Sequence, residues 1–157
     1  MKLHHITVVL CLGVLGLSAC NDTDHAVAAN SRICVDFKAA KPVQSAAPEA
    51  DASAGPLDDC VRRWAYSLAP SRDAADTVAQ AVVGACNGQL ARWNSQVLNV
   101  QGSAEAASLT TGEPTTPLAE HNAFAHGRAL LYVVQARAGA CAPPPATNGV
   151  PDGTGQP

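Results

Sequence analysis

Six cysteines are the residues of this chain whose possible chemistry depends most directly on spacing: Cys11, Cys20, Cys34, Cys60, Cys86 and Cys141. A cysteine sulfur can form a disulfide, bind a metal ion or carry a lipid, and each use requires different neighbours. No two of these cysteines have the Cys-x-x-Cys spacing typical of zinc and redox sites. The choice for each cysteine is therefore between a disulfide and lipid attachment.

The start of the chain predicts export. Lys2 gives a short basic start, an apolar run of 12 residues follows from Ile6 to Leu17, and the small residues Ser18 and Ala19 come next. This is the layout of a secretory signal peptide. As a helix the run would reach about 18 Å, which is well short of the roughly 30 Å hydrocarbon layer of a membrane. We therefore expect residues 1–19 to be a signal and not a membrane span.

The sequence Leu17-Ser18-Ala19-Cys20 resembles the lipobox of bacterial lipoproteins, in which the cysteine receives a diacylglyceryl group and the signal is cleaved just before it. The resemblance implies a lipid anchor at Cys20 and a location in the bacterial envelope, facing the periplasm. The alternative is an ordinary secretory signal with Cys20 as a disulfide partner. Asn21 stands where Asp would signal inner-membrane retention in lipoproteins of enteric type, which slightly favours the outer membrane.

Four cysteines remain for folding, namely Cys34, Cys60, Cys86 and Cys141, and an even number in an exported chain predicts two disulfides. Four cysteines allow three pairings. We expect Cys60 with Cys86, because both fall on apolar helix faces, and Cys34 with Cys141 by elimination. A simple helical hairpin turning at Pro70 would leave the first pair about 9 Å apart, beyond the roughly 7 Å limit. That pairing requires crossed helices or Cys60 in extended chain.

Composition divides the mature chain into a domain and two flanking segments. Residues 38–56 are rich in Ala, Pro and Ser, and residues 142–157 in Pro and Gly, so both bury little apolar surface. We expect residues 20–56 to be a lipidated, mostly flexible tether, with the strand-like stretch 31–37 pinned through Cys34. Residues 142–157 are expected to be a disordered tail, which leaves 57–141 as the folded domain.

Two helices are predicted in the first part of that domain. One starts near Pro56 to Asp58, with Cys60, Trp64 and Leu68 on one face and Asp58 and Asp59 four residues before Arg62 and Arg63. Another is expected over about 72–98 from an apolar stripe formed by Ala75, Ala79, Val82, Cys86, Leu90, Trp93 and Val97. Asn87-Gly88 could stop this helix, but the stripe keeps its phase across the pair. Gly84 and Gly88 are expected to pack tightly inside the protein.

A third helix is predicted from Thr116, a capping residue, and Pro117, a favoured first residue, to Gly139. Its apolar stripe is Phe124, Gly127, Leu131, Val134 and Ala138. The fold class is therefore all-α, as a small three-helix bundle with two disulfides.

The stretch from Cys60 to Cys86, "CVRRWAYSLAPSRDAADTVAQAVVGAC", is similar to a family of small uncharacterised exported proteins of Gram-negative bacteria. The resemblance covers 27 residues. It implies a pair of helices with two cysteines and assigns no functional residue.

No catalytic motif, phosphate loop or dinucleotide turn is present, so we expect neither an enzyme nor a cofactor. His121 and His126 are five residues apart, which turns them away from each other on a helix and argues against a metal site. Six Arg against seven acidic residues in 57–141 give no basic stripe for nucleic acid. The leading hypothesis is a tethered module that binds an envelope protein or the cell wall. The alternative is a periplasmic small-ligand binder with a pocket of Trp64, Tyr66 and Trp93.

Overall fold

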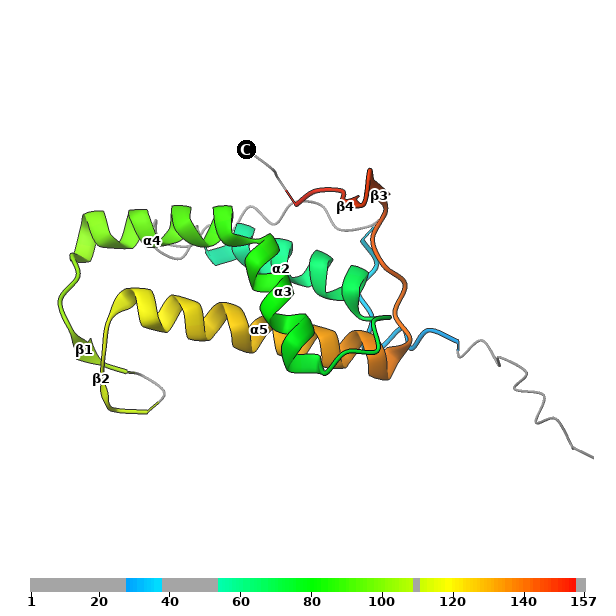
Figure 1. The fold of residues 1–157 in the computed structure, drawn as a ribbon, viewed down its shortest axis with the longest axis horizontal. Helices are drawn as coiled ribbons and strands as arrows, with labels where there is room; N and C mark the ends of the chain where they lie inside the picture. The colour runs from blue at the N-terminus through cyan, green and yellow to red at the C-terminus, as the bar shows by residue number, and fades with distance from the viewer. Residues whose placement is uncertain (1–27, 38–53, 109–110, 155–157) are drawn as a thin grey trace, which may run out of the picture.

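The computed structural model describes residues 28–37, 54–108 and 111–154, and this part of the chain forms four helices and two short hairpins (Figure 1). The helices are α2 (Ala54–Leu68), α3 (Ala75–Ala85), α4 (Asn87–Gln101) and α5 (Pro117–Gly139). The strands are β1 (Ala106–Ala107), β2 (Pro114–Thr115), β3 (Ala146–Thr147) and β4 (Val150–Pro151). The expectation of a mostly helical protein is confirmed, whereas the count of three helices is wrong.

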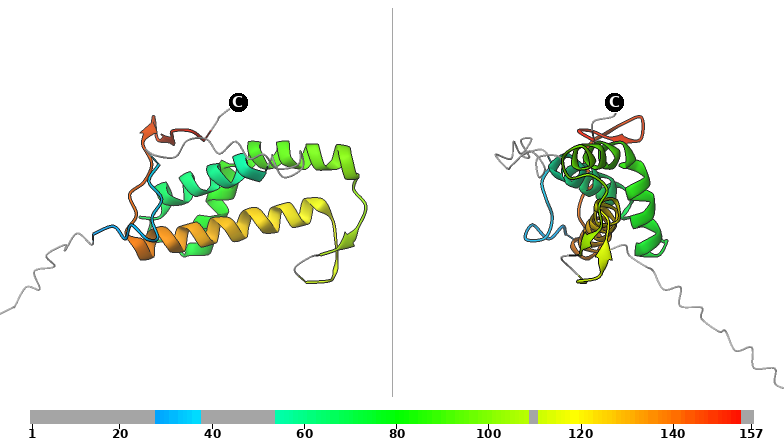
Figure 2. Two further views of the ribbon diagram at one scale, coloured as in Figure 1. Left: turned by 180° about the vertical axis from the view of Figure 1, so that it is seen from behind. Right: turned by 90° about the vertical axis from the view of Figure 1, so that its left-hand side faces the viewer.

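The longest helix, α5, organises the bundle because it contacts each of the other three helices. Figure 2 shows α5 on one side of the molecule, α2 and α4 on the other, and α3 crossing between them. The predicted ends of α5 are correct. Thr116 Oγ1 accepts a hydrogen bond from the amide of Ala119 at 3.3 Å, and Ala140 just after the helix adopts the left-handed conformation with φ 48°.

The helix expected over 72–98 is divided in two at Cys86. The apolar stripe itself is correct, since it is buried from Ala79 to Val97. The backbone of Cys86 has φ −101° and ψ 15°, and the weak helix formers Asn87 and Gly88 come directly after it. The chain therefore changes direction there, and α3 runs steeply across α2 while α4 runs along the bundle (Figures 1 and 2).

The crossing of α2 and α3 brings two cysteines within bonding distance. Cys60 and Cys86 form a disulfide with a Cα to Cα distance of 6.0 Å, so the separation expected for a simple hairpin does not apply. A second disulfide joins Cys34 to Cys141, with a Cα to Cα distance of 5.3 Å. The structure thus has the two pairs expected from the sequence.

The expected tight packing of Gly84 and Gly88 is wrong. Both are exposed, a Cβ built at Gly84 would meet no atom within 4 Å, and one at Gly88 would meet only Arg92 Nη1 at 3.8 Å. The glycine that does allow a close approach is Gly139, which lies against the disulfide of Cys34 and Cys141.

The predicted face of α5 is also reversed. The stripe of Phe124, Gly127, Leu131, Val134 and Ala138 is exposed, and the buried face carries His121, Ala125, Ala129, Tyr132, Val133, Ala136 and Gly139. Apolar residues occur all around this helix, so periodicity alone does not identify the inner face. Four of the seven inward residues are Ala or Gly, which let neighbouring helices approach α5 closely.

Residues 142–154, expected as part of a disordered tail, form a hairpin segment that packs on the helices. Asn148 and Gly149 have φ values of 52° and 80° and make the two-residue turn between β3 and β4. Pro151 and Thr154 are buried, and the Thr154 carbonyl accepts a hydrogen bond from the Gln89 side chain. We call residues 142–154 the C-terminal hairpin segment.

Residues 28–37, the N-terminal segment, also lie on the domain. Besides the disulfide at Cys34, the amide of Asn30 donates to the Gly139 carbonyl at 2.8 Å. The expected signal 1–19, the lipid site Cys20 and the stretch 38–53 of the expected tether lie outside the described residues. Among the helices that the structure describes, none is both long and apolar enough to cross a membrane.

Candidate functional site

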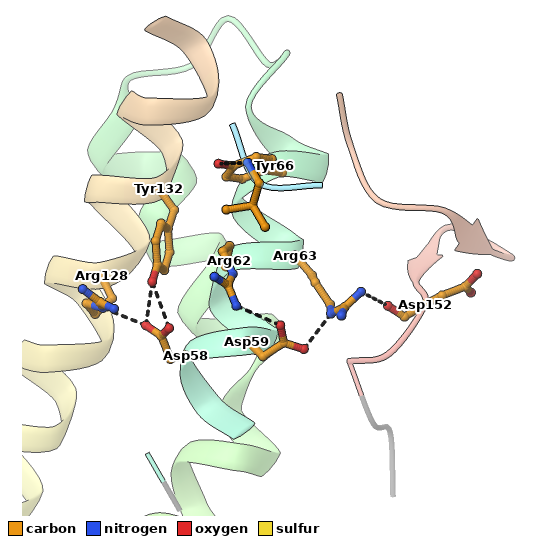
Figure 3. Close-up of polar contacts among 9 residues, drawn as sticks. Asp58, Asp59, Arg62, Arg63, Tyr66, Arg128, Tyr132 and Asp152 are labelled. Carbon is orange, nitrogen blue, oxygen red and sulfur yellow. Dashed lines mark hydrogen bonds and ion pairs between the residues drawn. The ribbon is translucent and has the colours of Figure 1, made fainter. Parts of the chain in front are cut away.

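A cluster of polar side chains joins α2 to α5 (Figure 3). The Asp58 carboxylate accepts a hydrogen bond from Arg128 Nε at 2.7 Å and from the Tyr132 hydroxyl at 2.9 Å to each oxygen. The sequence predicts that Asp58 pairs with Arg62, four residues later on the same helix. The structure instead directs Asp58 to α5, where it fastens two helices that are distant in sequence.

A second part of the cluster joins α2 to both flanking segments. Asp59 accepts hydrogen bonds from Arg62 Nη2 at 3.1 Å and from Arg63 Nε at 2.7 Å. Arg63 Nη1 donates to the carbonyl of Asp152 at 2.8 Å, and its guanidinium lies 5.2 Å from the centre of the Phe37 ring. Arg63 thus contacts the N-terminal segment, α2 and the C-terminal hairpin segment together, whereas the spacing in the sequence pairs it only with Asp59 on its own helix.

The electrostatics of this cluster favour a structural role over a role in proton transfer. Burial raises the pKa of Tyr132 to about 12, and the charge of Asp58 adds to the effect. Its hydroxyl therefore stays protonated and serves as a hydrogen-bond donor. The hydrogen bond to Asp58 likewise raises the pKa of Arg128. Asp58 and Asp59 both accept hydrogen bonds from guanidinium groups.

The two histidines have separate partners. The His121 ring stacks on Trp93 with centroids 3.5 Å apart, and His121 Nδ1 lies 2.6 Å from Asn94 Oδ1 of α4. Burial lowers the pKa of His121, and the charge of Glu120 opposes that effect. His126 Nε2 lies 3.1 Å from Asp76 Oδ1 of α3. Within the described ranges, no group of three or more His, Cys, Asp or Glu could hold a metal ion.

The aromatic residues named for a ligand pocket have different neighbours. Tyr66 is fully buried, packs edge-on against Phe37 at 5.1 Å, and its hydroxyl accepts from the Val35 amide at 3.4 Å. Trp93 instead stacks on His121 and meets the Phe124 ring edge-on at 5.4 Å. Trp64 is only partly buried. Tyr66 and Trp93 therefore pack against different rings.

A groove of about 320 Å³ lies elsewhere, between the N-terminal segment and the start of the C-terminal hairpin segment. Most of its lining is apolar, and Cys34 is one of the residues that line it. The lining residues are Ala29, Ser31, Cys34, Val35, Asp36, Phe37, Ala142, Pro143 and Pro145.

The solvent-facing side of α5 is the largest departure from the expected core. Phe124, Leu131 and Val134 expose 39%, 44% and 49% of their surface. With the exposed small residues Ala123, Gly127 and Ala138, they form what we call the outer face of α5. Between Glu120 and Arg137 the only Asp, Glu, Lys or Arg of this helix is Arg128, which binds Asp58. The outer face is therefore a continuous apolar strip without a charge at its centre.

Comparisons with protein-family models, with curated proteins and with solved structures found no match. Among the residues predicted to be chemically important, Cys34, Cys60, Cys86 and Cys141 are all in disulfides. The sequence did not predict the exposed outer face of α5 or the contacts of Arg63, and both come from the structure.

Proposed function

We propose that this protein is a lipid-anchored interaction module of a bacterial cell envelope, without enzymatic activity, and that the outer face of α5 binds an apolar helix of an envelope protein. The observation that carries the proposal is that the large apolar residues Phe124, Leu131 and Val134 lie exposed on the outer face of α5, while the neighbouring helices cover only its other side. Exposed apolar strips of this kind mark interaction sites.

The composition of the outer face favours a protein helix over a cell-wall polymer. A polymer of sugars would require several hydrogen-bonding side chains. Between Ala123 and Val134 the partly exposed side chains of this kind are His126 and Arg128, and both are already paired with carboxylates. Small residues beside large ones form grooves and ridges into which a second helix can pack. Gly127 is open on this face, since a Cβ built there would meet no atom within 4 Å.

The membrane anchor is supported by the lipobox-like sequence at Cys20. Two or more acyl chains hold a protein stably on a bilayer, because each buried CH₂ contributes about 0.8 kcal/mol. The anchor, its envelope location and the slight preference for the outer membrane belong to the proposal. Replacing Cys20 with Ala should release the protein from the membrane fraction, and failure of the wild type to incorporate labelled fatty acid would contradict the anchor.

The docking surface can be tested by photo-crosslinking in the native envelope. A crosslinking amino acid at Val134 should give one defined protein adduct, and one at the exposed Gln96 of α4 serves as the matched control. The adduct should disappear when Leu131→Glu is added, because a carboxylate on this face would have to be buried without a partner. Helical circular dichroism of Leu131→Glu should be unchanged. An adduct that survives this change, or forms equally from Gln96, would contradict the proposed surface.

The small-ligand hypothesis has weaker support. Two of its three aromatic residues are already packed against other rings, Tyr66 against Phe37 and Trp93 against His121.

A further inference from the structure

We propose that the disulfide between Cys34 and Cys141 is a reducible latch, which holds the N-terminal segment on the domain and thereby sets how far the domain can stand from its anchor. The two disulfides differ in their access to solvent. Cys60 and Cys86 are 1% and 0% exposed, whereas Cys141 is 9% exposed and Cys34 is half-buried and lines the groove beside Pro143. A thiolate must reach a disulfide sulfur to attack it, so the two bridges differ in their exposure to a reductant.

The chemistry is ordinary thiol–disulfide exchange with a dithiol reductant. One thiolate of the reductant attacks the Cys34 sulfur, the bond to Cys141 breaks, and the Cys141 thiolate takes a proton from water. The second thiolate of the reductant then attacks the reductant sulfur of the mixed disulfide. This step releases the Cys34 thiolate, which also takes a proton from water. The protein disulfide is reduced to two thiols while the dithiol is oxidised to a disulfide.

Noncovalent contacts also hold the N-terminal segment. The amides of Asn30 and Val35 donate to Gly139 and Tyr66, Phe37 packs between Tyr66 and Arg63, and Asp36 also has a partner. The core of the helices includes the fully buried Cys60 and Cys86 and also Cys141, and Cys34 and Phe37 of the N-terminal segment pack against it. We expect that opening the bridge between Cys34 and Cys141 loosens the segment while the four helices stay folded, because the helices are also joined by the buried bridge between Cys60 and Cys86.

The consequence for reach rests on the proposed function, because it requires the anchor at Cys20. Cys20 and Ala28, the first described residue, are eight Cα-to-Cα steps apart, and no conformation spans more than about 29 Å over that length. With the segment released, the connection from Cys20 to Ala54 has 34 such steps. The upper limit then rises to about 120 Å. Reduction would let a domain that is held near the membrane move farther away from it.

Selective reduction can be measured on the full chain with graded dithiothreitol, iodoacetamide and peptide mapping. Cys34 and Cys141 should be alkylated at least tenfold faster than Cys60 and Cys86, with helical circular dichroism unchanged. Hydrogen exchange should then show lost protection at the Asn30 and Val35 amides and intact protection in α5. Reduction of both bridges together, or a protected Asn30 after the bridge opens, would overturn the latch.

A variant provides an independent measurement that needs no reductant. Cys34→Ser with Cys141→Ser should show the same loss of protection at Asn30, and should keep the Cys60 to Cys86 bridge and the helical signal. Loss of the helical signal in this variant would overturn the latch, because the bridge would then be needed for folding.

The reach is tested with the acylated full chain in phosphatidylethanolamine and phosphatidylglycerol vesicles that contain a dansyl-labelled lipid. Energy transfer from Trp64 and Trp93 to dansyl should fall when the disulfide between Cys34 and Cys141 is opened. Unchanged transfer in vesicle-bound protein would overturn the change in reach. A chain that does not bind the vesicles would contradict the proposed anchor, which is a failure distinct from that of the latch.

Discussion

Arg63 and Asp152 are 89 residues apart in sequence, yet Arg63 Nη1 donates to the Asp152 carbonyl at 2.8 Å. The same guanidinium binds Asp59 and lies over Phe37. A Cβ built at Gly153, where φ is +84°, would be 2.9 Å from Arg63 Cζ, so the hairpin segment passes directly over this side chain. One arginine thus joins the two ends of the described chain through α2.

Replacing Arg63 with Ala should therefore loosen the C-terminal hairpin segment. The Arg63 side chain is mostly buried and makes charge-assisted hydrogen bonds, so we expect a loss of about 2 kcal/mol in the free energy of unfolding. Limited proteolysis should cut residues 142–154 faster than in the wild type. Arg72→Ala, at an exposed position, is the matched control and should change stability by less than about 0.5 kcal/mol. Equal effects of the two variants would refute the role of Arg63.

Gly139→Ala should hinder the disulfide between Cys34 and Cys141. A Cβ there would lie 2.8 Å from Cys141 Sγ and 2.9 Å from Cys34 Sγ, so the bridge or the end of α5 must shift. Peptide mapping under non-reducing conditions should show a larger free-thiol fraction at these two cysteines. Gly84→Ala is the control: that site is open and helical, and the change should stabilise the protein by about 0.5 to 1 kcal/mol. Complete bridge formation in Gly139→Ala would contradict the predicted clash.

The stability of the protein should fall between neutral and mildly acidic pH because of His121. Burial lowers the pKa of His121 in the folded state below the ordinary value of 6.5, so the unfolded chain binds a proton first. The stabilisation is therefore complete above the unfolded pKa and is lost as the pH falls through the folded pKa. Urea unfolding at a series of pH values measures this slope, and His121→Gln should flatten it. An unchanged slope in the variant would assign the effect to other groups.

At alkaline pH the corresponding group is Tyr132. Its pKa rises from 10.0 to about 12 in the folded state, so the unfolded chain releases the proton first and stability falls as pH rises through this interval. The difference in tyrosinate absorbance between wild type and Tyr132→Phe should show ionisation near pH 12. Because Asp58 keeps Arg128, the variant should lose only about 1 kcal/mol at neutral pH. Ionisation near pH 10 would show that the hydroxyl is solvated.

The sequence-based predictions are correct where the signal depends on residues that are close in the sequence. The cap at Thr116, the start at Pro117 and the stripe from Ala79 to Val97 depend on neighbouring residues, and the structure has all three. The turn at Asn148-Gly149 is also a local signal of a hairpin, and it was outweighed by the low apolar content of the segment. That segment is ordered by Arg63 and Gln89, two contacts across long sequence separations that composition does not reveal.

The candidate site was less predictable than the fold. The inner face of α5 could not be chosen from periodicity, because apolar residues occur on both sides of the helix. Likewise, the partner of Asp58 depends on how close α5 comes to α2, and local spacing favoured Arg62 instead of Arg128 and Tyr132.

Two adjacent valines of α5 provide the sharpest test of its orientation. Val133 is 0% exposed, whereas Val134 on the outer face is 49% exposed. Val133→Ala should create a cavity in the core and cost about 2 kcal/mol, while Val134→Ala should change the free energy of unfolding by less than about 0.5 kcal/mol. Chemical denaturation of the two purified variants measures both values, and the matched chemistry removes differences of propensity and size. If Val134→Ala proved the more damaging, α5 would have the orientation predicted from the stripe of Phe124, Leu131 and Val134, and the outer face would belong to the core.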